Sequence, residues 1–239
     1  MAAHLTNIIR GPGSYLYTQC LSQVQDARAA VEELHRRHRP IRRPVVDDRP
    51  WKLSTIRAGR VATARKDYPE AKRLYEQAAA AGYAMAMNNI GALYEEGSGV
   101  PKNYDESARW YSKAAAAGEP IAMVDLGWQY EHGHGVKKDL AEARRLYETA
   151  ANAGVPAGMN NLGLLYYYGR GVPRDYALAR KLFEQSVALG NAASMNDLGI
   201  LYKEGDGVPR DTKTARQWFE KAAALGNPEA KQNLRGMRK

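Results

Sequence analysis

The stretch AMVDLGWQYEHGHGVKKDLAEARRLYETAANAG, residues 122–154, decides the fold, because its pattern recurs along the chain every 36 residues. From Tyr68 onward this spacing holds without an insertion or a deletion, and blocks begin at Tyr68, Tyr104, Leu140, Tyr176 and Thr212. A fixed period of this length is the signature of a repeat architecture. So many positions in one phase exclude coincidence.

Several positions carry the same kind of side chain in block after block. An aromatic ring recurs at Tyr75, Tyr111, Tyr147, Phe183 and Phe219. One glycine recurs at Gly82, Gly118, Gly154, Gly190 and Gly226, and another at Gly91, Gly127, Gly163 and Gly199. Gly-x-Gly pairs followed by Val occupy residues 97–100, 133–136, 169–172 and 205–208. We expect the small residues to let neighbouring helices approach closely and the rings to fill the space between them.

Each block is predicted to form two helices. In the first half, apolar or small residues stand at Ala71, Leu74, Tyr75 and Ala78, which is the spacing of an amphipathic helix. Gly82 then ends the helix, because glycine readily adopts the left-handed conformation that follows a helix C-terminus. The second half repeats the pattern and again stops at a glycine. Since no strand pattern is present, the fold class is all-α.

The repeats and both ends of the array are expected to form one solenoid. A helix pair of this length cannot bury its apolar face alone, whereas stacked pairs bury a continuous core. Residues 51–66 lack the glycine and tyrosine positions and are predicted to form an N-terminal cap helix. In the last helix, predicted over 228–239, Arg235 and Arg238 replace a glycine and a tyrosine of earlier blocks. The last helix of an array has no further repeat to cover it, so its outer face must be polar. With a cap at each end, residues 51–239 are predicted to be a self-sufficient solenoid.

The recurring pattern resembles the Sel-one-like repeat (SLR) family. The residues that carry the resemblance are Ala122, Leu126, Gly127, Tyr130, Gly133, Gly135, Val136, Asp139, Ala143, Leu146, Tyr147, Ala150 and Gly154. The family is similar to tetratricopeptide repeats, and the resemblance implies a right-handed superhelix of antiparallel helix pairs that acts as an adaptor or scaffold. It covers about residues 67–239. A cysteine-rich branch of the family is associated with penicillin binding, but this chain lacks those cysteines, and the activity is not transferred.

The N-terminal part differs from the repeats in charge. Residues 1–67 carry 13 basic and 6 acidic side chains, whereas residues 68–239 carry 22 and 20, so most of the formal net charge of +9 lies in the first 67 residues. Six arginines and two prolines crowd the segment 35–49. Proline at 40, 44 and 50 prevents a continuous helix there. Residues 1–50 are therefore predicted to be a basic extension with one helix and a Pro/Arg-rich linker.

Composition also bounds the compartment. No run approaches the roughly 18 consecutive apolar residues of a membrane span, and the N-terminus lacks the pattern of a secretory signal. The single cysteine, Cys20, excludes a disulfide framework and a zinc site built on cysteines. We expect a soluble, cytoplasmic protein.

One face of the second helices remains after the core positions are assigned. Its residues fall at offsets of 3, 4, 7, 10 and 11 on one side of a helix, and the resemblance to tetratricopeptide repeats implies that this side lines a concave groove. The side chains differ between repeats, as expected where a fixed scaffold presents a variable surface. The candidate groove residues are Asn88, Asp125, Trp128, His132, Asn160, Leu164, Tyr167, Tyr168, Asn196 and Asp197.

Two interpretations of these residues remain open. The asparagines can bond the backbone of an extended peptide at repeated intervals, or they can bond the adjacent repeat, since buried amides are usually satisfied internally. Trp128, Tyr167 and Tyr168 are either anchors for a partner, because aromatic side chains dominate interface energetics, or part of the packing between repeats.

No constellation of residues predicts catalysis. The Gly-x-Gly loops follow helices rather than strands and so are not dinucleotide-binding turns. His132 and His134 have metal-ligating side chains, but other repeats hold no equivalent pair, so a solvated loop is expected there. His35 and His38 lack a third ligand, and the same interpretation holds. We expect no catalytic site, no metal and no cofactor.

The leading functional hypothesis is a non-enzymatic scaffold that holds a partner protein or extended peptide in the groove. The alternative is that the arginines of residues 36–49 bind nucleic acid or another anionic surface. Basic residues within the repeats are mostly paired with nearby Glu, as on an ordinary solvated helix face, so nucleic acid and membranes are not expected partners of the repeats.

Overall fold

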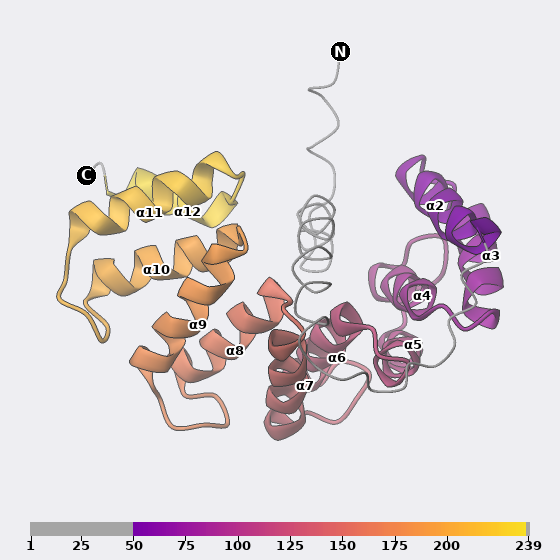
Figure 1. The fold of residues 1–239 in the computed structure, drawn as a ribbon, viewed down its shortest axis with the longest axis horizontal. Helices are drawn as coiled ribbons and strands as arrows, with labels where there is room; N and C mark the ends of the chain where they lie inside the picture. The colour runs from indigo at the N-terminus through magenta and orange to yellow at the C-terminus, as the bar shows by residue number, and fades with distance from the viewer. Residues whose placement is uncertain (1–49, 238–239) are drawn as a thin grey trace, which may run out of the picture. The chain divides into compact units, whose positions relative to one another are not determined.

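The computed structural model describes residues 50–237, which form helices joined by short turns and loops (Figure 1). The helices are α2 (Pro50–Ala64), α3 (Tyr68–Ala80), α4 (Ala84–Glu96), α5 (Tyr104–Ala116), α6 (Pro120–His132), α7 (Leu140–Asn152), α8 (Pro156–Tyr168), α9 (Tyr176–Ala188), α10 (Ala192–Glu204), α11 (Thr212–Ala224) and α12 (Pro228–Gly236). No strand occurs among the described residues. The prediction of an all-α chain built from helix pairs is confirmed.

The predictions for the two ends fall partly outside this range. The basic extension, with Cys20, His35 and His38, lies outside the described residues, as do residues 238–239. The N-terminal cap helix that was predicted over 51–66 corresponds to α2, and the C-terminal cap helix that was predicted over 228–239 corresponds to α12.

The described chain divides into two compact units, with the division inside α7 between Leu146 and Tyr147. We call residues 50–146 unit 1 and residues 147–237 unit 2. In unit 1 the consecutive helices α2 to α6 pack against one another, and in unit 2 the consecutive helices α8 to α12 do the same. Each unit is therefore a stack of neighbours, as repeat architectures are.

Short polar side chains begin the helices and glycines end them. Asp67, Asn103 and Asp175 each accept a hydrogen bond from a backbone N–H in the first turn of α3, α5 and α9, at 3.3, 3.1 and 2.9 Å. This contact satisfies one of the unpaired donors at a helix N-terminus. The helices α4, α6, α8 and α10 end at glycines with φ between 69° and 84°, where a side chain would be strained.

A glycine-on-ring contact recurs inside the units. A Cβ added to Gly91 would lie 2.6 Å from the ring of Tyr111, and one added to Gly163 would lie 2.6 Å from the ring of Phe183. A Cβ added to Gly199 would lie 2.5 Å from the ring of Phe219. These rings are almost wholly buried. The glycine position of the second helices thus exists so that an aromatic ring can lie directly on the helix backbone.

Helix α2 takes part in the same contact, contrary to the expectation that it lacks the repeat's glycine position. A Cβ on Gly59 would lie 2.5 Å from the ring of Tyr75. The connection from α2 to α3 covers only residues 65–67, whereas that from α4 to α5 covers 97–103. Because α2 lacks the longer Gly-x-Gly turn, Gly59 stands out of phase with the 36-residue spacing. The turn is closed instead by Lys66, at a φ of 61°.

Replacing Gly163 with Val should destabilise the chain by about 2–4 kcal/mol, because the new side chain would overlap the buried ring of Phe183. Gly236→Val is the matched control, since nothing lies within 4 Å of a Cβ at that position. Urea unfolding followed by circular dichroism measures both. Equal free energies of unfolding for the two variants would show that the ring of Phe183 does not need a glycine at position 163.

Candidate functional site

The candidate residues lie on the second helices of the pairs. Asn88 belongs to α4, and Asp125, Trp128 and His132 belong to α6, all in unit 1. In unit 2, helix α8 carries Asn160, Leu164, Tyr167 and Tyr168, and α10 carries Asn196 and Asp197. The structure therefore distributes the candidates over two surfaces, one in each unit.

The asparagines bond the neighbouring helix pair. The amide nitrogen of Asn160 donates to Asp197 Oδ2 at 2.6 Å and to Ser194 Oγ at 2.9 Å. The amide nitrogen of Asn233 donates to Asn196 Oδ1 at 2.9 Å. Their hydrogen-bonding capacity is used between repeats, so these contacts match the structural alternative that the sequence left open.

Two carboxyl groups beside these asparagines have raised pKa values. Burial raises the pKa of Asp197 to about 7, Glu229 adds to the rise, and the amides of Asn160 and Asn196 oppose it. Burial likewise raises the pKa of Asp125 in unit 1 to about 8, with Glu95 and Glu119 adding and the Asn88 amide opposing. Both groups are thus part of the pH response of the fold.

In unit 1 the candidates Trp128 and His132 belong to a stack of rings, which we call the unit 1 ring cluster (Tyr104, Trp128, His132 and His134). Trp128 lies 4.5 Å from His132 and 4.9 Å from His134 between ring centroids, and His134 stacks on Tyr104 at 4.5 Å. His132 is exposed, and Trp128 is half-buried. The Nδ1 atom of His132 lies 2.8 Å from the carbonyl oxygen of Trp128, which fixes the ring at the end of α6.

In unit 2 the equivalent place holds tyrosines, which we call the unit 2 ring cluster (Tyr167, Tyr168 and Tyr176). The hydroxyl of Tyr167 donates to Asp206 Oδ2 at 2.6 Å, and its ring meets those of Tyr168 and Tyr176 edge-on. Tyr168 is 48% exposed, and the guanidinium of Arg170 lies 4.4 Å from its ring centroid. Tyr168 is therefore the ring of this cluster that is most open to a partner.

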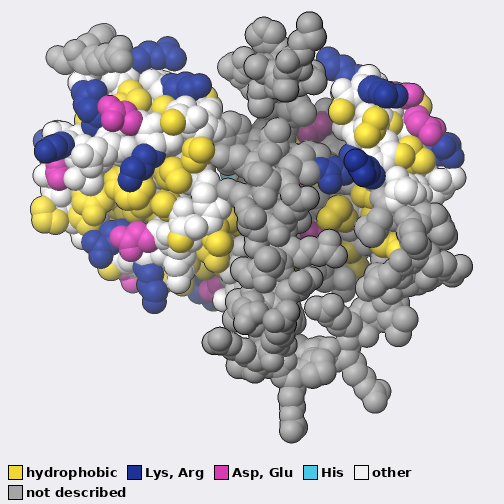
Figure 2. Space-filling model, turned by 45° about the horizontal axis from the view of Figure 1, so that its top comes forward, with side chains coloured by type: hydrophobic (Ala, Val, Ile, Leu, Met, Phe, Trp, Pro, Cys, Tyr) yellow, Lys and Arg dark blue, Asp and Glu magenta, His cyan; other side chains and the backbone are white. Residues whose placement is uncertain are grey.

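The remaining candidate, Leu164, is half-buried and packs against the core cluster of unit 2 that includes Phe183 and Leu198. Figure 2 shows hydrophobic side chains gathered in the middle of the face that unit 2 presents, with Lys, Arg, Asp and Glu around them. An apolar centre with a charged rim is the usual anatomy of an interface.

The Gly-x-Gly turns help to build the ring clusters, because each turn packs on the first residue of a helix that belongs to the cluster. The sequence analysis did not predict this role. A Cβ on Gly207 would lie 2.6 Å from Cβ of Tyr176, and one on Gly135 would lie 2.0 Å from the backbone oxygen of Tyr104. The turn thus lies on the first residue of α9 or α5, which brings its central residue, Asp206 or His134, beside the cluster. The signal was present in the sequence, because the central residue changes from turn to turn while both glycines stay.

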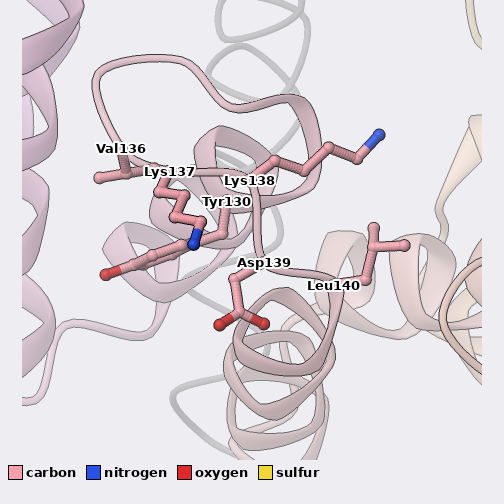
Figure 3. A pocket seen from close by; sticks show the side chains of 6 residues that line it. All are labelled: Tyr130, Val136, Lys137, Lys138, Asp139 and Leu140. Carbon is pink, nitrogen blue, oxygen red and sulfur yellow. The ribbon is translucent and has the colours of Figure 1, made fainter.

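A separate open pocket of about 700 Å³ lies in unit 1, beside the turn between α6 and α7. Figure 3 shows the side chains of Lys137 and Lys138 leading away from each other, with Asp139 directed at the helix that it caps. Asp139 accepts hydrogen bonds from the backbone nitrogens of Ala141 and Glu142 at 2.9 and 3.0 Å. Its carboxylate is therefore occupied as a helix cap.

Within residues 50–237, no group of three or more His, Cys, Asp or Glu side chains is placed to hold a metal ion. The rings of His132 and His134 both lie against the ring of Trp128. None of the described helices is long and apolar enough to cross a membrane.

Comparison with known families identifies the repeat. The sequence model of the Sel1 repeat matches residues 59–83, 84–119, 120–155, 156–191 and 192–227. The chain belongs to the Sel1 repeat family. The first match begins at Gly59, the glycine that contacts Tyr75 in α2. Proteins of this family generally mediate protein–protein interactions.

Solved structures agree. A Sel1 repeat protein from Oxalobacter formigenes is 33% identical, with a TM-score of 0.68, over 75% of this chain and 73% of that one. A protective antigen of uropathogenic Escherichia coli strains with an SLR fold is 34% identical, with a TM-score of 0.66, over 78% of this chain. This chain covers 41% of that antigen.

An immunity protein from Pseudomonas aeruginosa is 24% identical, with a TM-score of 0.58, over 79% of this chain and 70% of that one, and shows the shared fold alone. A search of the curated proteins finds no match.

The raised pKa values of Asp125 and Asp197 predict that stability falls as the pH rises. The unfolded chain releases these protons near its ordinary pKa of about 4, whereas the folded chain keeps them until about pH 8 and about pH 7. Between these values the folded state binds more protons, so each rise in pH favours unfolding. We expect the melting temperature to drop from about pH 5 to about pH 8, and to drop less in the double variant Asp125→Asn, Asp197→Asn.

The matched control for this measurement is Asp211→Asn. Hydrogen bonds from Thr214 lower the pKa of this exposed cap residue, so its contribution is lost only as the pH falls, below the range tested. A double variant with the same pH slope as the native chain would show that the two carboxyl groups are ionised in the fold.

Proposed function

We propose that the chain is a non-enzymatic scaffold and that a partner protein binds to the unit 1 and unit 2 ring clusters. The observation that carries this proposal is the contrast between two sets of rings. The shared rings, such as Tyr111 and Phe183, are buried on glycines, whereas Tyr168, at a position that varies between repeats, is 48% exposed. Rings that the fold does not bury are available to a partner.

The side chains suit such a role. Aromatic anchors with a polar handle give large contact area at small entropic cost, and they dominate measured interface energies. Trp128 offers its half-buried ring in unit 1, and Tyr168 offers its ring and hydroxyl in unit 2. One charged group flanks the exposed ring, since the guanidinium of Arg170 lies over Tyr168. We infer that the partner packs against the exposed ring surface of each cluster.

The asparagines play a smaller part in this proposal than the sequence suggested. Asn160 and Asn196 already bond the neighbouring helix pair. A peptide backbone would therefore compete with bonds of the fold itself, at a free-energy cost. The rings supply the affinity, and the amides hold the scaffold in register.

The second candidate function is favoured by charge alone. Residues 1–67 carry 13 basic and 6 acidic side chains, which suits nucleic acid or another anionic surface. Phosphate binding weakens steeply with salt because counterions are released, whereas binding to aromatic anchors weakens only mildly. A salt titration of the captured complex therefore distinguishes the two functions.

Site-specific photo-crosslinking tests the proposal in the native cell. Trp128 and Tyr168 are replaced, one at a time in the full chain, by p-benzoylphenylalanine, and the captured proteins are identified by mass spectrometry. We expect the same partner at both positions. Tyr168→Ala should weaken its binding by about 2 kcal/mol or more, as truncation of an aromatic anchor commonly does, with an unchanged melting temperature.

The controls are Trp110, a half-buried tryptophan on α5, and Leu225, which is 50% exposed at the end of α11. Crosslinking at these positions should not capture the partner. Equal capture at all four positions would refute the proposal. So would capture that is lost only when the arginines of residues 36–49 are replaced by Gln.

A further inference from the structure

The face between α4 and α6 in unit 1 gathers carboxyl groups. The hydroxyl of Tyr111 donates to Glu95 Oε2 at 2.7 Å, and the charges of Glu95 and Glu119 both act on Asp125. Glu96 adjoins Glu95 on α4 and is exposed. Glu95 and Asp125 themselves are half-buried and so remain open to solvent in part. This face is the acidic face of unit 1 (Glu95, Glu96, Glu119 and Asp125).

These carboxyl groups lack the counter-charges that others in the unit have. On the first helices, Glu70, Glu106 and Glu142 are bonded at 2.6–2.7 Å by Arg73, Arg109 and Arg145. Within the described part of the chain, Glu95, Glu119 and Asp125 form no ion pair. Lys102 is the cation that acts on Glu95, and its ammonium lies over the ring of Tyr104.

Two buried acceptor atoms of the same helices, α4 and α6, have no donor. Asn88 is 6% exposed and its amide lowers the pKa of Asp125, but its Oδ1 has no partner. Gln129, one turn after Asp125 on α6, is fully buried and donates to Ser107 Oγ at 2.8 Å, but its Oε1 has no partner. Buried acceptors are nearly always satisfied. The face is therefore short of both donors and positive charge.

The pKa values of the carboxyl groups are raised, as expected where donors and positive charge are few. Burial raises the pKa of Glu95, with the Tyr111 hydroxyl opposing and Glu96 adding. Burial and the charges of Glu95 and Glu119 raise the pKa of Asp125 to about 8. Mutual repulsion of the carboxylates contributes to these raised pKa values. A cation placed among them would offset that repulsion and lower the pKa values.

Unit 2 shows what the same positions look like when they are satisfied. Asp197, equivalent to Asp125, accepts from the amide nitrogen of Asn160 at 2.6 Å, and the amides of Asn160 and Asn196 both lower its pKa. The position of Glu95 is taken by Tyr167, whose hydroxyl bonds Asp206. The shortage of donors is thus a property of unit 1 and not of the repeat.

We propose that the acidic face of unit 1 binds an arginine side chain of the partner protein, held between Glu95 and Asp125 and beside Trp128. The inference rests on the proposed function, since the arginine belongs to the partner that the unit 1 ring cluster holds. A guanidinium carries five donors in a planar fork, so it can bond two carboxylates at once and stack on an aromatic ring. Trp128 follows Asp125 by one turn on the same side of α6 and supplies that ring.

The test uses the full chain and a probe that needs no knowledge of the partner. The peptide acetyl-Gly-Arg-Gly-amide is titrated into ¹⁵N-labelled protein, and the indole N–H of Trp128 and the side-chain amides of Asn88 and Gln129 are followed by NMR. The same peptide with citrulline in place of Arg is the neutral control. We expect saturable shifts with the arginine peptide and none with citrulline.

Glu95→Gln and Asp125→Asn should each lower the affinity for the arginine peptide by about tenfold, as expected for the loss of a charge-assisted bond. Glu95→Gln keeps an acceptor for Tyr111, and Asp125→Asn recreates the amide pair that Asn196 and Asn233 already form in this chain. Both should therefore fold. Asp197→Asn, the equivalent change in unit 2, should leave the affinity unchanged. Affinity should rise from about pH 6 to about pH 9, because Asp125 must lose its proton to pair with the cation.

Equal binding of the citrulline peptide, equal loss in Asp197→Asn, or the absence of shifts at Trp128 would overturn the proposal. So would tighter binding after the arginines of residues 36–49 are replaced by Gln, because the occupant would then be this chain's own segment. These outcomes are separate from the photo-crosslinking result, which locates a partner on the rings whether or not it carries an arginine.

Discussion

The contact between an aromatic ring and a glycine on the facing helix is the constraint on which the repeats depend. Where Gly163 meets Phe183 or Gly199 meets Phe219, a single added carbon would stand about 2.5 Å from the ring. The ring replaces the side chain that the glycine lacks, so the two helices are held at a short, fixed distance. Because close-packed interiors do not yield easily, this contact fixes how helix pairs stack within each unit.

The remaining features of each unit follow from that fixed stacking. Once the second helices stand in register, amides and carboxyl groups on neighbouring pairs come within bonding distance, as Asn160 and Asp197 do. The Gly-x-Gly turns pack on the first residues of α5 and α9, so the central residue of each turn lies beside a ring cluster. What varies between repeats is then concentrated on one set of positions, where a change in side chain does not disturb the core. This separation lets one scaffold present different chemistry in unit 1 and unit 2.

Periodicity alone predicted the helix pairs, their glycine ends and the shared aromatic core, because those properties depend on spacing along one helix. It missed Gly59, since the short connection before α3 removes the glycine from the 36-residue phase. It left the role of Asn160 open, because an amide bonds a neighbour or a ligand equally well, and only the three-dimensional neighbours decide. The stack of Tyr104 on His134 joins residues far apart in the chain, and the unpaired Oδ1 of Asn88 depends on atomic positions that no pattern records.

A double-mutant cycle between Gly163 and Phe183 measures the central contact most directly. Gly163→Ala and Phe183→Leu are made separately and together in the full chain, and the free energy of unfolding is obtained from urea titrations. If the ring lies on the glycine, removing the ring relieves the clash, and the double variant is more stable than the sum of the single effects predicts, by about 1 kcal/mol or more. Effects that add within about 0.5 kcal/mol would contradict the account, because residues without direct contact behave in that way.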